Sequence, residues 1–287
     1  MKLGAVYPQV ELGGDPDVAR HIGGSLEDLG YDHLLAYDHV LGAEHADREP
    51  PLMGPYDESH PFHEPLTLFS YLAGRTERLE FVSGVVILPQ RQTALVAKQA
   101  ADLAVLSGNR FRLGVGVGWN PVEYEALGED FSTRGRREEE QIQLLRRLWS
   151  EDVVTFDGRF DRIERAGILP RPSAPVPIWL GGYSERSFRR AARFGDGFIF
   201  SNRNTEAVEH WGRIRALLDE EGRSADEFGV EYAILSDTGP EDAAARVERW
   251  AEQGGTHASI VTMGLGLDSS QAHLDYLGQV AEHLGRS

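Results

Sequence analysis

One histidine of this 287-residue chain stands where it could transfer a proton. His39 follows residues 33–37, a short apolar run that predicts a β-strand, and Asp38 lies directly before it. Imidazole is the side chain best suited to moving a proton near neutral pH. We therefore expect His39 and Asp38 to form the acid–base part of a site at the end of this strand. The alternative is a histidine that only bonds to a neighbouring loop.

A glycine-rich strand end forms a second group. Residues 111–119 read Phe-Arg-Leu-Gly-Val-Gly-Val-Gly-Trp, so Gly114, Gly116 and Gly118 share one face of a predicted strand. Three glycines on one face indicate that something bulky lies close to the backbone. Tight packing inside a closed barrel and a flat cofactor over the strand ends both explain this, and they are compatible. The spacing is not a dinucleotide fingerprint, because Trp119 or Pro121 would stand at its third glycine.

A third candidate is a site for phosphate. Gly181, Gly182 and Tyr183 link a predicted strand to a helix that Ser184 can cap. Free backbone N–H groups and the helix dipole favour an anion at such a helix start. The sequence predicts phosphate binding there, with a tight turn as the alternative explanation for the glycines.

The segment from residue 40 to residue 63 is long and irregular, which is typical of a functional lid or a disordered loop. Its histidines and acidic residues match no metal-ligand spacing, so we expect an acidic lid and no metal site. The residues considered as ligands, including Glu64 directly after the segment, are Glu44, His45, Asp57, His60, His63 and Glu64. The chain has no cysteine, which excludes disulfides and thiolate chemistry. It also lacks a nucleophile elbow and a P-loop.

Composition narrows the possible partners. The formal net charge is −17, which disfavours non-specific nucleic-acid binding. No apolar run approaches the roughly 20 residues that span a bilayer, and the N-terminus lacks the apolar core of a signal peptide. We expect a cytoplasmic protein that acts on a small molecule and binds neither nucleic acid nor membrane.

Predicted strands and helices alternate along the whole chain, with Asp15 as the cap of one helix and another helix predicted over about residues 93–106. This order predicts an α/β fold, a (β/α)8 barrel in one domain over residues 1–287, with a long loop after strand 2 and a hairpin inserted before strand 5. An open doubly wound sheet is the alternative. Active sites of such barrels lie at the C-terminal ends of the strands. The predicted strands are residues 1–8, 33–37, 81–88, 111–118, 178–182, 198–201, 230–235 and 259–262.

With these residues in view, the chain resembles the luciferase-like monooxygenase superfamily, and more closely its deazaflavin-dependent oxidoreductases. The matching stretches run from the second strand to the fifth, over the first two-thirds of the chain. Together they are quite specific. They are residues 37–39, 83–91, 98–103, 106–110, 113–119, 134–137 and 179–182.

The resemblance implies a barrel that binds coenzyme F420, a deazaflavin, at its C-terminal mouth, and a hydride transfer between that cofactor and a small organic substrate. It implies a non-prolyl cis peptide in the third strand, at Gly84–Val85 or one bond either way. It also makes His39 the active-site histidine. The residues that it would place around the cofactor are Ser83, Gly84, Val85, Gly116, Gly118, Trp119, Gly181, Gly182 and Ser184.

One departure matters for the chemistry. The sugar-phosphate dehydrogenases of the superfamily have an acidic glutamate at the end of the fourth strand, where this chain has Trp119. We therefore expect a different substrate, with Asp38 or the substrate itself as a further proton source. The alternatives are an FMN-dependent monooxygenase fed by a cofactor reductase, a non-catalytic F420-binding protein, and a phosphate-binding barrel isomerase. A homodimer is a family-level expectation.

Overall fold

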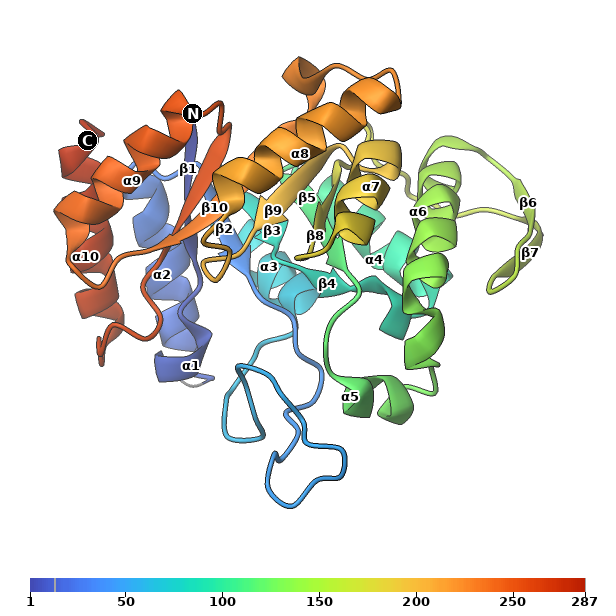
Figure 1. Cartoon of the computed structure of the whole chain (residues 1–287), viewed down its shortest axis with the longest axis horizontal. Helices are drawn as coiled ribbons and strands as arrows, with labels where there is room; N and C mark the ends of the chain where they lie inside the picture. The colour runs from blue at the N-terminus through green and yellow to red at the C-terminus, as the bar shows by residue number, and fades with distance from the viewer. Residues whose placement is uncertain (13, 287) are drawn as a thin grey trace.

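The barrel is built from parallel strands that close on themselves. The computed structural model describes residues 1–12 and 14–286. The sheet order β3-β2-β1-β11-β10-β9-β8-β5-β4 is closed by a β3–β5 pairing (Figure 1). The closed parallel sheet confirms the predicted (β/α)8 fold. The barrel strands are β1 (Lys2–Val6), β2 (His33–Ala36), β3 (Glu80–Ser83), β4 (Val86–Ile87), β5 (Phe111–Gly116), β8 (Ile178–Gly181), β9 (Gly197–Phe200), β10 (Gly229–Leu235) and β11 (His257–Val261).

The helices surround this sheet, and several begin at the predicted caps. The Asp15 side chain accepts from the Asp17 amide at the start of α2, and Ser184 forms a capping box with Ser187 at the start of α7. The helices are α1 (Gln9–Leu12), α2 (Pro16–Asp28), α3 (Pro65–Ala73), α4 (Thr93–Leu106), α5 (Pro121–Ala126), α6 (Arg134–Ser150), α7 (Glu185–Phe194), α8 (Ala207–Glu220), α9 (Pro240–Glu252) and α10 (Ser270–His283). Three short 3₁₀ turns are η1 (Leu88–Gln90), η2 (Phe131–Thr133) and η3 (Ala225–Glu227).

The third barrel strand is interrupted. The apolar run over residues 81–88 predicts one continuous strand, but the structure divides it into β3 and β4. Between them the Gly84–Val85 peptide bond is cis, which confirms the position that the family resemblance implied. The interruption pushes Val85 out of the regular ladder and toward the barrel axis, where it packs against the lumen cluster.

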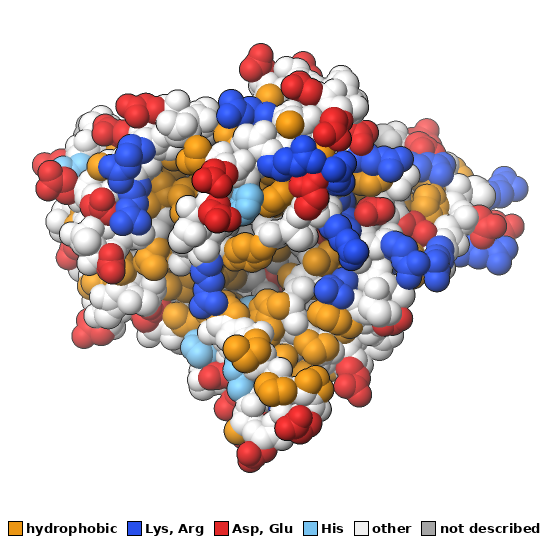
Figure 2. All heavy atoms as spheres, viewed as in Figure 1, with side chains coloured by type: hydrophobic (Ala, Val, Ile, Leu, Met, Phe, Trp, Pro, Cys, Tyr) orange, Lys and Arg blue, Asp and Glu red, His pale blue; other side chains and the backbone are white. Residues whose placement is uncertain are grey.

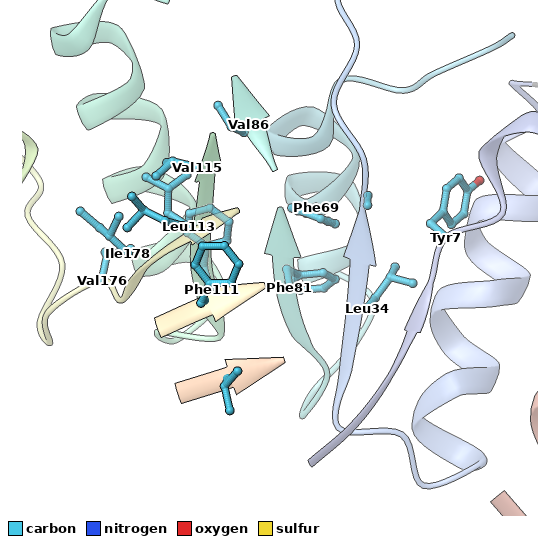
Figure 3. Packing of buried hydrophobic residues seen from close by; sticks show 14 of the residues in the cluster. Tyr7, Leu34, Phe69, Phe81, Val86, Phe111, Leu113, Val115, Val176 and Ile178 are labelled. Carbon is cyan, nitrogen blue, oxygen red and sulfur yellow. The ribbon is translucent and has the colours of Figure 1, made fainter. Parts of the chain in front are cut away.

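The core between barrel and helices is apolar. Phe111, Leu113 and Val115 of β5 point outward into it, as the alternation in the sequence predicts. Phe69 of α3 packs against Phe81 and Phe111, with ring centroids 5.3 and 6.3 Å apart (Figure 3). Gly114 and Gly116 therefore face the lumen, and the packing of this shell fixes which residues of each strand reach the site.

Two insertions depart from the strand–helix alternation. The antiparallel hairpin of β6 (Val154–Asp157) and β7 (Arg162–Ala166) lies outside α6, close to its predicted position (Figure 1). Residues 37–64 form a long loop without helix or strand that projects beyond the C-terminal ends of β1 and β2. We call this segment the lid loop. Among the described helices, none is long and apolar enough to cross a membrane.

Candidate active site

The lumen of the barrel holds side chains in layers, because every second residue of a strand points inward. A buried apolar cluster forms the middle of the lumen, and Tyr37, Val85 and Leu235 pack on it from the C-terminal side. Above them Figure 2 shows a hollow bordered by apolar side chains, between the lid loop and the barrel. We call this hollow the mouth. The cluster consists of Val6, Leu35, Val82, Trp179, Ile199, Ala233, Val261 and Met263.

His39 lies at the mouth, enclosed by aromatic rings. Its side chain is 11% exposed. The ring centroids of Phe62, Tyr56 and Trp119 lie 4.8, 5.1 and 5.8 Å from the centroid of the imidazole. Two of these rings come from the lid loop and one from the end of β5. The imidazole is therefore shielded by segments that are far apart in the sequence.

The carboxylate beside His39 is Glu123, a residue that the sequence analysis missed. Its Oε1 lies 3.5 Å from His39 Nδ1 and accepts hydrogen bonds from the Val40 and Leu41 amides at 2.9 and 3.1 Å. Gln90 Nε2 donates to Oε2 at 3.2 Å. Burial raises the pKa of Glu123, but the donors around it, His39 first among them, bring that pKa below its ordinary value. Glu123 is thus a buried carboxylate that stays charged beside the imidazole.

Glu123 reaches His39 because of the short helix α5. Asn120 caps this helix by accepting from the Val122 amide, and Pro121 occupies its first turn. Asn followed by Pro is a helix-start signal, and an acidic residue in the first turn strengthens it. This signal is present in the sequence, but Glu123 lies 84 residues from His39, so the helix start alone did not predict their contact.

Asp38, the predicted partner, is bound elsewhere. Its Oδ2 accepts the Ile87 amide at 3.0 Å, and its Oδ1 pairs with Arg91 Nη2 at 3.0 Å. Burial raises the pKa of Asp38 above its ordinary value, against the opposing effects of Arg91 and the Ile87 amide. Asp38 therefore ties the end of β2 to β4 and η1. A catalytic role for it stays a prediction.

Val85 explains part of the glycine pattern. A Cβ added to Gly116 would lie 2.6 Å from Val85 Cγ2, and one added to Gly181 would lie 3.0 Å from Val85 Cγ1. A Cβ added to Gly114 would lie 1.8 Å from the Ser83 carbonyl oxygen. The Ser83 hydroxyl donates to the Gly114 carbonyl oxygen and accepts from the Gly114 amide. Groups of the protein itself therefore occupy the space beside these glycines, as the closed-barrel interpretation predicts. Contacts of Ser83, Gly84, Val85, Gly116 and Gly181 with a cofactor stay predictions.

The lid loop is seated on the end of β5. Gly118 has φ 62°, so the turn there uses a conformation that favours glycine. A Cβ on Gly54 would lie 2.1 Å from the Trp119 ring, and the His45 and Trp119 rings meet edge-on with centroids 6.3 Å apart. Gly118 and Trp119 thus border the mouth on the side that the lid loop covers, and their predicted cofactor contact is not tested by this packing.

The predicted phosphate site is a helix start with an open approach. Gly182 has φ 152°, and a Cβ there would lie 2.7 Å from the Ser187 side chain. The Ser184 hydroxyl accepts from the Ser187 amide, which satisfies one of the free N–H groups of α7. The other amides of the first turn have no partner within the helix. The geometry suits an anion at Gly182 and Ser184.

Several polar atoms around the mouth are buried without a hydrogen-bond partner among the described residues. They include the Tyr37 hydroxyl, the Nε2 atom of His45 beside Trp119, and the Oε1 atom of Gln90 beside Glu123. Buried polar groups are nearly always paired, so such a cluster marks a place where a ligand would complete the bonding. The described residues contain no group of three or more His, Cys, Asp or Glu that could hold a metal ion.

The fold and the site define a (β/α)8-barrel protein with a buried histidine–carboxylate pair at its C-terminal mouth. The particular family follows from its sequence. The chain belongs to the luciferase-like monooxygenase family, whose model matches residues 5–282.

Similar proteins carry different names within this family. An uncharacterised protein of Mycobacterium tuberculosis is 34% identical over 233 residues, which cover 79% of each chain. An F420-dependent glucose-6-phosphate dehydrogenase of Intrasporangium calvum is 32% identical over 66% of this chain and 60% of its own. An FMNH2-dependent dimethylsulfone monooxygenase of Pseudomonas fluorescens is 30% identical over 67% of this chain and 53% of its own.

Solved structures agree on the fold. The monooxygenase RslO1 from Streptomyces bottropensis superposes with a TM-score of 0.80 at 19% identity, over 99% of this chain and 98% of its own. An F420-dependent secondary alcohol dehydrogenase in complex with an F420–acetone adduct gives a TM-score of 0.81 at 15% identity, with the same coverage. At these identities the likeness supports the architecture alone.

Proposed function

We propose that this chain is an oxidoreductase that transfers a hydride between coenzyme F420 and a small organic substrate. The observation that carries the proposal is the buried His39–Glu123 pair at the rim of an apolar mouth. Reducing a carbonyl group or oxidising an alcohol moves a proton together with the hydride, and a shielded imidazole can give or take that proton. The F420-dependent relative at 32% identity supports the choice of cofactor.

The described residues fit such a cofactor. Unpartnered polar atoms border the mouth, Val85 rises between Gly116 and Gly181, and the start of α7 offers amides to a phosphate. We propose that the ring lies against Val85, Gly118 and Trp119, and that Gly182 and Ser184 meet the phosphate of the tail. When bound, the deazaflavin supplies or accepts the hydride at a ring carbon.

The residues around His39 have separate tasks. Glu123 holds the imidazole in place and stabilises its positive charge when it takes up a proton. Tyr56, Phe62 and Trp119 exclude water from the imidazole. Asp38, through Ile87 and Arg91, keeps the end of β2 in register with β4 and η1, which fixes the backbone that carries His39.

A flavin-dependent reaction is the second candidate. The FMNH2-dependent relative at 30% identity supports it, and the same mouth would serve a flavin. In that case a separate reductase would supply reduced FMN, and oxygen would be a substrate. A protein that binds F420 without turnover is a third candidate.

A side-by-side titration with F420 and FMN tests the cofactor, with the quenching of each cofactor's fluorescence as the signal. We expect tight binding of F420 and weaker binding of FMN. The reverse order would favour the monooxygenase, and binding of neither would refute both. Gly182→Ala serves as the mechanistic variant and Gly24→Ala as its control, because a Cβ at Gly182 would meet Ser187 whereas one at Gly24 would meet nothing within 4 Å. We expect only Gly182→Ala to weaken cofactor binding.

A further inference from the structure

Tyr37 offers an unused hydroxyl at the floor of the mouth. It follows Leu35 by two residues and packs on the same lumen cluster, so its ring continues the inward-facing row of β2. Its hydroxyl is buried and has no hydrogen-bond partner among the described residues. A buried hydroxyl without a partner costs stability, and a bound ligand group would supply what is missing.

Arg203 lies across the mouth from β2, in the turn after β9. Its amide donates to Ser201 Oγ at 3.2 Å, and Ser201 also bonds the Tyr183 hydroxyl. Ser201 stands two residues after the lumen residue Ile199, so this turn leaves the barrel at the rim of the mouth. The positive charge of Arg203 acts on the Tyr37 and Tyr56 hydroxyls, whose pKa values burial raises and Arg203 opposes.

Arg203 is an exposed cation that no described residue pairs with. Within the described residues its guanidinium forms no ion pair within 4.0 Å and no hydrogen bond, whereas Arg91, near the same mouth, is bound to Asp38 and Glu64. Of the carboxylates near the mouth, Glu123 accepts from its donors, and Glu11 accepts the Gly264 amide through Oε1 while its Oε2 has no partner among the described residues. An anionic ligand would therefore find one free guanidinium there.

We propose that Arg203 and the Tyr37 hydroxyl form a subsite that binds a carboxylate group of the substrate. The guanidinium presents a planar set of donors that matches a carboxylate, and the hydroxyl adds a donor from the floor. Tyr56 connects this subsite to His39, since its ring lies edge-on to the imidazole. The substrate class is thus a small carboxylic acid with an apolar or aromatic body that lies between Arg203 and His39. This assignment rests on the proposed function.

Binding of benzoate and benzamide tests the subsite, because the two probes share a ring and differ in charge. Calorimetric titrations are made on the chain alone and on the chain saturated with F420. We expect the wild-type protein to bind benzoate at least about tenfold more tightly than benzamide. Arg203→Gln should abolish that preference and Tyr37→Phe should reduce it. Arg159→Gln, which removes an exposed guanidinium from the β6–β7 hairpin, is the control and should leave it unchanged.

The outcomes that overturn the subsite differ from those that overturn the proposed function. Equal binding of both probes by the wild-type protein, no benzoate binding, or a preference that survives Arg203→Gln each refutes the carboxylate subsite. Weaker F420 binding by Arg203→Gln also refutes it, because Arg203 would then serve the acidic tail of the cofactor. If the wild-type protein binds no F420 but keeps an Arg203-dependent benzoate preference, the proposed function fails and the subsite stands.

Discussion

The two ends of the barrel lumen differ in how the polar groups that they bury are paired. At the N-terminal end, Glu231 accepts from His33 at 2.7 Å and pairs with Arg112 at 2.8 Å, and Arg112 also stacks 3.9 Å from the Trp179 ring. At the C-terminal end, the Tyr37 hydroxyl has no partner among the described residues. Within the described part of the chain, the lower layer pairs its carboxylate with a cation, although His33 Nδ1 and Arg112 Nη2 have no partner of their own, whereas the mouth leaves a neutral hydroxyl unpaired.

This difference separates structure from function within one cavity. Burial raises the pKa of Glu231, but Arg112 and His33 outweigh it and hold that pKa well below its ordinary value. Because removing one partner of such a buried pair strongly destabilises a protein, we assign Glu231 to the stability of the fold. At the mouth, Glu123 and Asp38 are the carboxylates with such partners, and they position the segments that carry His39. The lower layer should therefore govern stability, and the mouth should govern binding and turnover.

The largest expected effect is on turnover. His39→Ala should lower kcat by about 10² to 10⁴-fold, because the proton that accompanies hydride transfer loses its shielded carrier. F420 affinity and the free energy of unfolding should change little. Steady-state rates with F420 and fluorescence titrations measure the two effects. His21→Ala, on the outer helix α2, is the control and should retain wild-type rates. Normal turnover by His39→Ala would remove His39 from the chemistry.

The largest expected effect on stability comes from the lower layer. Glu231→Gln should reduce the free energy of unfolding by about 3–5 kcal/mol, because Arg112 would remain buried without its main counter-charge. Urea unfolding measures the change. Glu80→Gln is the matched control, since Glu80 pairs with the same guanidinium at 3.3 Å but is 20% exposed, and its effect should be smaller. Equal losses from both variants would contradict the special role of the buried layer.

Two glycines of β5, Gly114 and Gly116, should separate an effect on stability from an effect on cofactor binding. Gly114→Ala should destabilise the fold by about 1–3 kcal/mol, because its Cβ would meet the Ser83 carbonyl oxygen. Gly116→Ala should cost less stability but weaken cofactor binding, because its Cβ would displace the Val85 side chain. Thermal unfolding and F420 titration are measured on both variants. A loss of F420 affinity in Gly114→Ala alone would reverse this assignment.

The smallest expected effect is the pH dependence of stability. Burial, with the charge of Arg112, lowers the pKa of His257 to about 2, so the folded chain keeps this imidazole neutral. The unfolded chain takes up a proton there below about pH 6.5. Stability contributed by His257 is therefore complete above that pH and is lost as the pH falls toward 2, by at most about 1.4 kcal/mol per pH unit.

Urea unfolding at pH 7.5 and pH 5.5 should show that loss, and His257→Gln should reduce it. An unchanged pH dependence in His257→Gln would show that other groups cause it.

The sequence predicts the barrel because each strand and helix is marked by local chemistry. The helix over residues 93–106 has the observed bounds, and Asp15 and Ser184 cap the helices that they were expected to cap. The cis bond at Gly84–Val85 followed from family resemblance and not from local propensity. Local patterns thus identify the elements, and resemblance supplies a feature that patterns do not contain.

The site was harder to predict because it depends on side-chain direction and on distant segments. Asp38 and His39 are neighbours in sequence, but successive residues of an extended chain point to opposite sides, and Asp38 turns to Ile87 and Arg91. The carboxylate that faces His39 comes from α5, a short helix that the sequence analysis did not predict. The lid-loop rings of Tyr56 and Phe62 were likewise beyond prediction, because no periodicity marks a loop.

Anaerobic turnover of reduced F420 tests the central claim most directly. The purified chain is mixed with reduced F420 and a panel of small oxo acids, and the return of oxidised F420 absorbance is followed with and without oxygen. A parallel series uses reduced FMN. We predict turnover with reduced F420 that needs no oxygen and that is lost in His39→Ala. Turnover with reduced FMN and oxygen alone would contradict the hydride-transfer account and assign the chain to the flavin-dependent monooxygenases.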